Sequence, residues 1–514
     1  MTSKAVSVPQ ELQELPFHTN SAVQPGKINL ARITAIVNGK PITKDVTGAI
    51  SEIYYYESIL DNTISATMML VDSGYELPPG SRKTESDSLK TLDGLQSTSG
   101  IINELQITGG ERVDFEIQDE NLFSGKQKIR MAGRTQMYIN RVRDLTNSGL
   151  KDVYALDLVP PEYITNELTR VTGRYEGKPN DHVKKILNDI VDPTVNYFED
   201  EAFYPYNFIG NNKKPLHVCT WLAAKSSPSV PSQDGKSTDG GAAGFFFYQT
   251  RDGFHFKSID KFLDKTFIRI GVDSEGREFP IRNEKIVRRE FIYNNTGKAA
   301  VRRNTPGDNF NDSPNILAYT VKKAVDVGKD LAMGTYNNVT TFFDFYSMNY
   351  IHRPYKVDPE KLNPFAKISL PEETVISSPS RYMTRVLDVG VMPDGGNLEA
   401  WKAAKEAQNY KADKIMVQSL MRYNQLFSLQ VKITIAGDFD LRAGDIVECK
   451  FMDLNLNKEQ NLELSGPYLI ANICHRLTAN DTFTTMDLVR DSTKFEKFAT
   501  KEETDDFIRR TEAQ

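Results

Sequence analysis

The sequence predicts a mainly β fold with α+β insertions. Three observations lead to this class. Segments rich in strand-forming residues fill both ends of the chain, turn pairs such as Asn38-Gly39 and Asp252-Gly253 separate them, and helical periodicity is confined to a few stretches. The 514 residues are 39% hydrophobic and 26% charged, which is ordinary for a globular protein and sufficient to bury several cores.

The amino-terminal part of the chain predicts an arm followed by a β domain. Residues 1–26 hold three prolines and no period, which is typical of a flexible arm. Residues 27–160 predict a first small β-barrel or sandwich, interrupted by a loop insertion over residues 72–104. Its expected strands are Ile28–Val37, the hairpin Ile50–Leu60 with Ile64–Val71, Val113–Ile117, Lys128–Met131, Met137–Val142 and Val153–Val159.

The next part changes character. Residues 161–243 predict an α+β connecting domain, with helices over Asn180–Ile190 and Pro215–Ala224 and a Ser, Pro and Gly rich loop over Ser226–Ala243. Residues 244–264 contain the clearest hairpin of the chain, two aromatic-rich runs around an Asp-Gly turn.

The last part combines an insertion, a long helix and a second β domain. Residues 265–424 predict an inserted mixed domain that ends in a helix over Leu398–Tyr423, a stretch without Gly or Pro. Residues 425–492 predict strands that complete a β domain with 244–264, and 493–514 form a charged tail. Within the insertion, strands are expected near Phe267–Ile270, Lys285–Tyr293 and Thr340–Tyr346, and an irregular connection over Pro354–Pro371.

Charge and composition weigh against several classes of protein. The net charge is −6, whereas a general nucleic-acid binder is more often basic. No apolar run reaches the roughly 20 residues that span a bilayer, and Met1–Asn20 does not resemble a secretory signal. Three cysteines, Cys219, Cys449 and Cys474, are too few for a disulfide framework, so buried free thiols are expected.

A search for catalytic or metal-binding patterns leaves no candidate. No two of the six histidines have the spacing of a zinc-binding helix, and Cys449 with Cys474-His475 lacks a CxxC partner motif. Gly235-Lys236-Ser237 lacks the first glycine of a phosphate-binding loop, because position 230 is Val230. We therefore expect no catalytic, cofactor-binding or metal-ligating residue and no cofactor. The six histidines are His18, His182, His217, His255, His352 and His475.

Two aromatic runs could be binding platforms or core. Tyr54-Tyr55-Tyr56 and Phe245-Phe246-Phe247-Tyr248 lie in expected strands. Aromatic side chains are common in strands that pack on both faces of a sheet. We expect both runs to be core.

Two stretches carry a resemblance to a known family. Leu216–Ser226 forms a short helix with a Trp-Leu-Ala-x-Lys-Ser ending and precedes the hairpin Gly244–Ile259. The long helix precedes Thr434–Val447, in which a strand reaches a Gly-Asp-Phe-Asp-Leu-x-x-Gly turn and returns; Ser465–Ile470 and Asn472–His475 follow. In this order they resemble the baseplate central hub proteins of contractile-tailed phages.

That resemblance implies a structural role. It implies two small β-barrel domains with mixed connecting domains, a homotrimeric ring, and partners comprising a central spike trimer, a tail tube hexamer and other baseplate (wedge) proteins. The location implied is the tail baseplate of a virion assembled in the host cytoplasm. The resemblance implies no membrane insertion, no sequence-specific nucleic-acid binding and no enzymatic activity.

Two alternatives remain open at the level of sequence. A related spike-base protein of a contractile injection or secretion machine would share the fold. A hub that carries a cell-wall hydrolase would need a catalytic domain, for which residues 265–395 offer room, and no motif there indicates one.

Overall fold

The computed structural model describes most of the expected β regions. The arm up to Pro25, most of the expected loop Ser226–Ala243 and the tail from residue 493 lie outside the described residues. The described residues are 26–72, 75–76, 96–97, 100–119, 126–148, 151–192, 194–228, 244–262, 268–272, 278–282, 287–293, 316–324, 326–345, 348–357, 370–388, 390–391, 397–400, 412–451, 461, 463–478 and 481–492.

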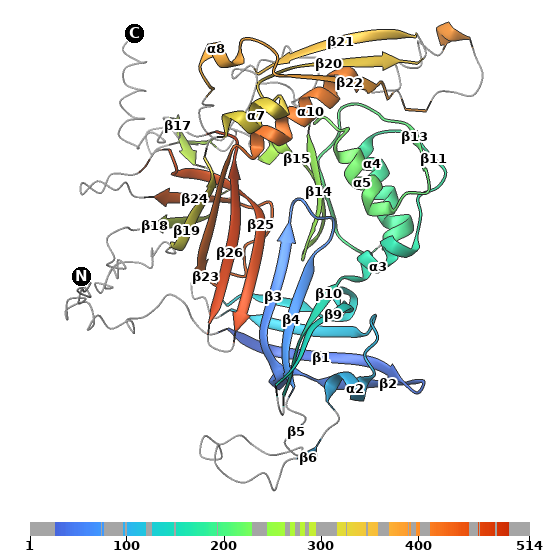
Figure 1. Cartoon of the computed structure of the whole chain (residues 1–514), viewed down its shortest axis with the longest axis vertical. Coiled ribbons are helices and arrows are strands. Elements are labelled where there is room, and N and C mark those ends of the chain that lie inside the picture. The colour runs from blue at the N-terminus through green and yellow to red at the C-terminus, as the bar shows by residue number, and fades with distance from the viewer. Residues whose placement is uncertain are drawn as a thin grey trace, which may run out of the picture.

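Fourteen of the described strands form one sheet (Figure 1). Its main path runs β19-β23-β26-β25-β3-β4-β10-β9-β7-β1-β2, with β24 and β8 attached to β25 and β7, and β18 attached to β24. The bounds are β1 Lys27–Val37, β2 Lys40–Asp45, β3 Ile50–Ser58, β4 Ser65–Asp72, β7 Arg112–Gln118, β8 Lys128–Met131, β9 Met137–Ser148, β10 Lys151–Val159, β18 Val287–Tyr293, β19 Ile316–Lys323, β23 Leu429–Ala436, β24 Ile446–Phe451, β25 Gly466–Thr478 and β26 Thr482–Arg490.

The pairing of β3 with β25 joins the two ends of the chain. The antiparallel register runs from Asn472 opposite Ser58 to Thr478 opposite Glu52, so residues more than 400 positions apart lie side by side. In Figure 1 the blue β3 and the orange β25 are neighbours in the middle of the sheet. The strands before residue 160 and those after 425 therefore form one hydrogen-bonded structure.

A separate hydrophobic core lies on each side of this seam. The first core is built by alternate residues of β1, β3, β4 and β7–β10; in β7, for example, Val113, Phe115 and Ile117 are buried and their neighbours are partly exposed. The second core is built mainly by β23–β26, where Ile433 and Leu488 are fully buried. The period-two patterns of the sequence predicted the inward positions of β7 in the first core and of β23 in the second.

The mainly β class with mixed parts is confirmed, while the barrels stay open among the described residues. The path β18-β24-β25-β26-β23-β19 curls until its two ends approach, with the rings of Tyr293 and Tyr319 4.6 Å apart. No β-ladder joins β18 to β19 in the part of the chain that the structure describes.

A third core lies where helices cover the expected hairpin. The hairpin is β14 (Phe245–Thr250) with β15 (Gly253–Ser258), as predicted, and β12 (Tyr197–Glu199) pairs with β15. Helices α4 (Pro179–Ile186), continued by the π-helical turn η5 (Leu187–Val191), and α5 (Pro215–Ala223) occupy the predicted helical stretches.

The aromatic run of β14 is core on both faces, as expected. Phe245 and Phe247 pack in the third core, whereas Phe246 and Tyr248 pack in the second. Alternate side chains of one strand thus connect two cores. In the other run, Tyr55 is fully buried while Tyr56 is about a third exposed.

A small three-stranded sheet with the order β21-β20-β22 lies at the top of the molecule in Figure 1. Its strands are β20 (Asn337–Asp344), β21 (Asn349–Lys356) and β22 (Arg381–Val386). Helix α10 (Ala412–Leu426) packs against β21, and α7 (Val327–Met333) packs against β22. The first part of the expected helix Leu398–Tyr423, residues 401–411, lies outside the described residues.

Two details differ from the sequence expectations. Pro354 lies inside β21 and not in an irregular connection, because β21 is an edge strand of its sheet and an edge tolerates the missing N–H. Ile101–Leu105, within the expected loop and strand region, form helix α2, which buries Ile101 and Leu105 against the first core.

The remaining short elements complete the chain. They are η1 Thr47–Ala49, β5 Tyr75–Glu76, β6 Gln96–Ser97, η4 Gly133–Thr135, α3 Pro161–Leu168, β11 Arg174–Tyr175, β13 Phe208–Ile209, α6 Ile259–Phe262, β16 Ile268–Val272, β17 Glu278–Arg282 and α8 Glu373–Ile376. No helix among the described residues is long and apolar enough to cross a membrane.

We predict that Phe115→Ala destabilises the chain by about 3–5 kcal/mol, because Phe115 is fully buried in the first core and its loss leaves a cavity. Urea denaturation followed by tryptophan fluorescence and circular dichroism measures the effect. Ile36→Ala is the matched control, since Ile36 on β1 is 77% exposed. Equal effects of the two substitutions would contradict the assignment of the core.

Candidate functional site

The turn between β23 and β24 is the point where three parts of the chain meet. It comprises Gly437–Asp445, the Gly-Asp-Phe-Asp-Leu-x-x-Gly phrase of the sequence, and we call it the junction turn. Glycine is required at its end. Gly444 has φ +88° and an added Cβ would lie 2.2 Å from the hydroxyl oxygen of Tyr248.

Two buried carboxylates of the amino-terminal β region accept hydrogen bonds from the backbone of the junction turn. Phe439 N donates to Asp119 Oδ2 (2.8 Å), and Ala443 N donates to Glu57 Oε2 (3.1 Å). Both carboxylates are almost fully buried. The bonds join residues 320 and 386 positions apart, so they fasten the junction turn to the first β region.

Glu57 also holds the aromatic hairpin. Its Oε1 accepts from Arg251 N (3.0 Å) and from the Tyr55 hydroxyl (3.0 Å). Burial raises the pKa of Glu57, against the opposing effects of the Arg251 charge and of these donors. One carboxylate on β3 therefore connects the hairpin turn with the junction turn.

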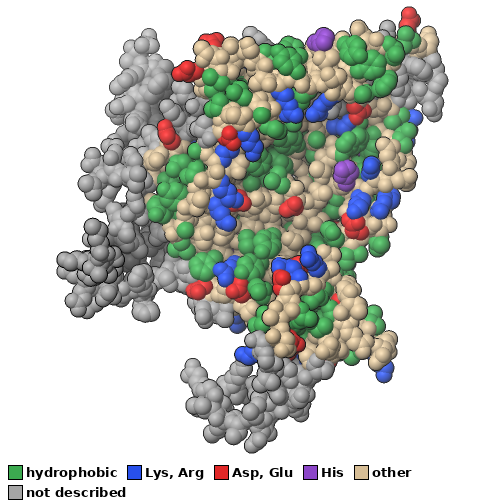
Figure 2. Space-filling view, in the orientation of Figure 1, with side chains coloured by type: hydrophobic (Ala, Val, Ile, Leu, Met, Phe, Trp, Pro, Cys, Tyr) green, Lys and Arg blue, Asp and Glu red, His purple; other side chains and the backbone are tan. Residues whose placement is uncertain are grey.

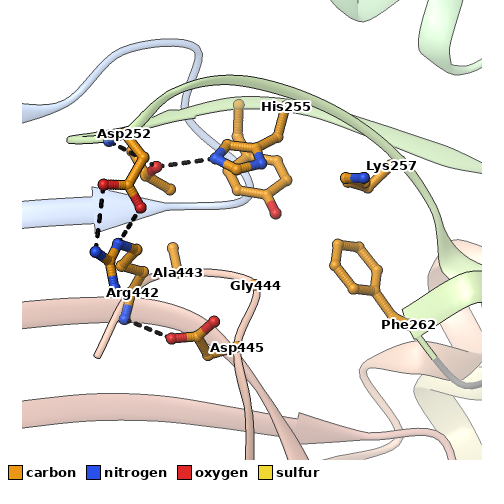
Figure 3. Close-up of a pocket in the computed structure, with 10 residues that line it drawn as sticks. Asp252, His255, Lys257, Phe262, Arg442, Ala443, Gly444 and Asp445 are labelled. Atoms are coloured by element: carbon orange, nitrogen blue, oxygen red, sulfur yellow. Dashed lines mark hydrogen bonds and ion pairs between the residues drawn. The ribbon is translucent and has the colours of Figure 1, made fainter. Parts of the chain in front are cut away.

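Arg442 connects the junction turn with the same hairpin from the other side (Figure 3). Its guanidinium pairs with Asp252, with Nη2 3.2 Å from Oδ1. Its Nη1 donates to the carbonyl of Asp440 (2.7 Å), and its backbone N donates to Asp445 Oδ2 (3.0 Å). The fork geometry of arginine lets one side chain serve both segments.

Arg289 of β18 pairs with the other carboxylates of the junction turn. Its Nε lies 3.1 Å from Asp438 Oδ2 and its Nη2 3.2 Å from Asp440 Oδ2. Asp438 is buried and Arg289 about a quarter exposed, so this pair is screened less than a surface pair. The inserted region after residue 265 is thereby joined to the junction as well.

His475 on β25 lies beneath the junction turn with both ring nitrogens engaged. Nδ1 is 2.9 Å from Thr484 Oγ1 and Nε2 is 3.3 Å from the carbonyl of Leu441, so Nε2 carries the proton. Its ring meets the Phe439 ring edge-on, with the centroids 5.0 Å apart, and is stacked with the Tyr55 ring, with the centroids 6.3 Å apart. Burial, with the charges of Arg251 and Arg442, lowers the pKa of His475 to about 3.

A cavity of about 350 Å³ lies beside the junction turn. Figure 3 shows Lys257, His255 and Phe262 around it, with Arg442 and Asp445 on the opposite side. His255 is stacked between Tyr248 and Phe198, each 4.9 Å away, and burial lowers its pKa to about 4. Lys257 pairs with Asp200 and Arg442 with Asp252, so the charged groups neutralise one another within the protein.

The cysteines and histidines form no metal centre in the part of the chain that the structure describes. No group of three or more His, Cys, Asp or Glu residues there could hold a metal ion. Cys219 and Cys449 are buried free thiols, as expected, and Cys474 is half-buried. Burial raises the pKa of Cys474 to about 11, which keeps the thiol protonated at neutral pH.

A second polar cluster explains the Trp-Leu-Ala-x-Lys-Ser phrase. The ammonium of Lys225 lies over the rings of Trp221 and Tyr206, 4.3 and 4.6 Å from their centroids, and pairs with Asp388. Lys225 is only 6% exposed. The phrase therefore anchors the end of α5 to the segment after β22 through cation–π contacts and an ion pair.

The sequence identified the junction turn and the Lys225 phrase but not their partners. Asp119, Glu57 and Arg289 lie far away in the sequence, and no local pattern marks them.

The junction turn and the Lys225 cluster hold distant segments of the chain together. A protein of Vibrio phage KVP40 described as "Probable baseplate hub protein gp334" is 19% identical over 441 residues, covering 80% of this chain and 90% of that protein. This match confirms the resemblance to phage baseplate hub proteins. No protein-family model matches the chain.

The solved structures that the chain matches have low sequence identity and TM-scores below 0.5. A tail protein from Neisseria meningitidis MC58 is 12% identical, with 89% of this chain and 96% of that chain covered and a TM-score of 0.42. The 43 kDa tail protein of prophage MuSo2 from Shewanella oneidensis is 10% identical, with 90% and 100% covered and a TM-score of 0.41. The E. coli c3393 protein, described as a type VI secretion system component, is 9% identical, with 92% and 79% covered and a TM-score of 0.35.

We predict that Gly444→Ala destabilises the chain by about 2 kcal/mol or more, because it adds a Cβ at a positive φ against the Tyr248 hydroxyl. Gly48→Ala is the matched control, since nothing lies within 4 Å of its added Cβ. Thermal and urea unfolding of the two variants should differ by this amount. A Gly444→Ala protein as stable as Gly48→Ala would contradict the described packing of the junction turn.

We predict a pH dependence of stability from His475. Its folded pKa lies below the ordinary value of 6.5, so the unfolded chain binds the extra proton first as the pH falls. Stability is full above pH 6.5 and declines toward pH 3, by up to about 1.4 kcal/mol per pH unit from this residue. His255 adds a decline in the same direction.

Urea unfolding at a series of pH values tests this. His475→Gln should lower stability at pH 7 and flatten the decline below pH 6.5. The exposed His217→Gln on α5 should leave the profile as in the wild type. A His475→Gln profile parallel to the wild-type profile would show that His475 is not the titrating group.

Proposed function

We propose that the chain is the structural hub of a contractile phage baseplate, in which three copies form a ring that joins the hexameric tail tube to the trimeric central spike. The observation that carries the proposal is the match to a baseplate hub protein along 90% of that protein's length. The match covers 80% of this chain and 90% of that protein, so it relates most of each protein and not one short shared module.

The physical features of the chain support such a role. A hub transmits load between partners of different symmetry, which needs a stiff body and large interfaces. The junction turn, Glu57 and Arg442 tie the first and last β regions, the hairpin and β18 into one hydrogen-bonded body. We propose that this body is the part of the ring that bears load.

We propose the following division into domains. Residues 27–160 would form the first barrel and 244–264 with 425–492 the second, linked by the connecting domain 161–243 and the inserted domain 265–424. The separate first and second cores on the two sides of the β3–β25 seam support two β regions, and β18 and β19 of the inserted part pair with strands of the second region. Two similar barrels in each of three copies would give a nearly six-fold surface for a hexameric tube.

We propose further that the chain works without catalysis. The relative from Vibrio phage KVP40 is described as a probable baseplate hub protein, and the charged groups Lys257 and Arg442 that line the described cavity pair within the protein. The other partners would be wedge proteins of the baseplate, met during assembly in the host cytoplasm.

The solution mass of the purified full chain tests the proposal, measured by light scattering after size exclusion. The chain would be measured alone and mixed with the spike protein encoded by the same virus. We expect a mass of three chains, either alone or when the spike is added. A monomer that binds neither spike nor tube protein would overturn the hub assignment, and peptidoglycan turnover by the same preparation would then favour the hydrolase alternative.

A further inference from the structure

The small sheet β21-β20-β22 carries a concentration of exposed large hydrophobic side chains. Phe345, Met348, Tyr350, Tyr382 and Val386 are between 54 and 72% exposed. All five lie on this sheet or at the tip of its β20–β21 hairpin. Scattered exposed hydrophobic residues are normal, whereas a contiguous group on one surface marks an interaction site.

The strand register places these side chains on one face. Phe343 of β20 lies opposite Tyr350 of β21 and opposite Val386 of β22, and Val339 lies opposite Tyr382. The rings of Phe343 and Tyr350 are 5.2 Å apart, so the group is continuous across the strands. We call this surface the outer face, comprising Phe343, Phe345, Met348, Tyr350, Tyr382 and Val386.

The other face of the same sheet is already covered. Phe342 points the opposite way from Phe343, is fully buried, and packs in the third core with Val417 of α10. In Figure 1 helices α7 and α10 lie beneath the sheet, and Figure 2 shows hydrophobic side chains gathered along the upper edge of the molecule. Among the described residues, the outer face has no covering element.

The charges of the edge strands indicate what would cover the outer face. Strands β21 and β22 contain no Asp or Glu, although the chain as a whole carries −6, and of their four cations Arg353, Arg381 and Arg385 have the parity of the inner face. Lys356 is exposed and shares the parity of Tyr350, so it borders the outer face. The surface therefore complements apolar groups bordered by carboxylates.

The backbone at the tip of the β20–β21 hairpin is strained. Met348 adopts φ +52°, a conformation that is unfavourable for a large side chain and common at binding sites. This strained residue is also among the most exposed hydrophobic side chains of the outer face.

Two other occupants fit the outer face less well. A two-fold contact with the same face of a second copy would offer Lys356 no carboxylate from β21 or β22, because these strands contain no Asp or Glu. Nucleic acid would need several outward cations, whereas Arg381 lies on the inner face and donates to the carbonyl of Met333.

We propose that the outer face is a docking surface for a different baseplate protein, one that presents an apolar surface bordered by Asp and Glu. This inference rests on the proposed hub function and adds a peripheral partner surface to it. Tyr350 and Tyr382 would be the main contacts, with Lys356 meeting a partner carboxylate at the rim.

A zero-length carbodiimide cross-link in purified tails tests the proposal, because it joins a lysine amine to a carboxylate only in direct contact. We expect the Lys356 peptide to be joined to an Asp or Glu of another tail protein. Lys356→Arg should keep the tails assembled and abolish this link, since arginine retains the charge but does not form the amide.

Hydroxyl-radical labelling gives a second reading. Labelling of Tyr350 and Tyr382 should fall by at least about fivefold in tails relative to the free chain, as in the water-excluded centre of an interface. The Tyr350→Ser, Tyr382→Ser double variant should enter tails but lose the cross-linked protein. Leu145→Ser on β9, also at an exposed hydrophobic residue, is the control that should retain it.

The remaining outcomes overturn the proposal. A Lys356 link to this chain's own sequence would assign the outer face to a second copy or to another segment of the chain. Binding of a single-stranded oligonucleotide that the double variant loses would assign it to nucleic acid. Unchanged labelling in tails, with no link, would show a bare surface. Absence of the chain from tails would contradict the hub function itself.

Discussion

The architecture depends on buried carboxylates that satisfy backbone N–H groups across great sequence separations. Glu57 and Asp119 come from the first β region, and each accepts from the junction turn more than 300 residues later. A buried carboxylate is costly to desolvate unless donors surround it, and a buried N–H is costly without an acceptor. Each hydrogen bond therefore offsets the desolvation cost of both groups. Separating the two segments would leave a buried carboxylate and a buried N–H group without partners.

The β3–β25 seam extends this dependence over a whole strand. Its ladder joins the two β regions, and His475 on β25 contacts Tyr55 of β3, Phe439 of the junction turn and Thr484 of β26. Arg442 and Arg289 add the hairpin and the inserted region to the same point. Although the chain has several cores, the contacts that join them meet at the junction turn. That suits a protein whose proposed work is to connect partners without changing shape.

Local patterns predicted the elements, while the long-range pairings were beyond them. Alternation in Val113–Ile117 and Leu429–Ile435 marks inward positions, and turn residues mark the hairpin of β14 and β15. Periodicity says which face is buried but not which strand lies next in the sheet, so the β3–β25 seam was not foreseen. Pro354 was misassigned because a sequence does not reveal which strand is an edge.

The sequence predicted the junction turn but not its partners, because local patterns do not specify long-range contacts. The glycine and aspartate spacing of the junction turn stands out, since turns have local rules. Glu57 and Asp119 look like any other acidic residues until the fold places them under the turn. The outer face was hidden as well, because an alternating strand indicates two faces without saying which one another element covers.

Hydrogen exchange of the seam amides in the full chain tests most directly whether the two β regions form one body. The account predicts that the slowest amides of β3 and β25 share one opening free energy and that Glu57→Ala lowers it for both strands together. Amides of β25 that open while those of β3 stay protected, or a Glu57→Ala effect confined to β3, would show that the two regions move independently.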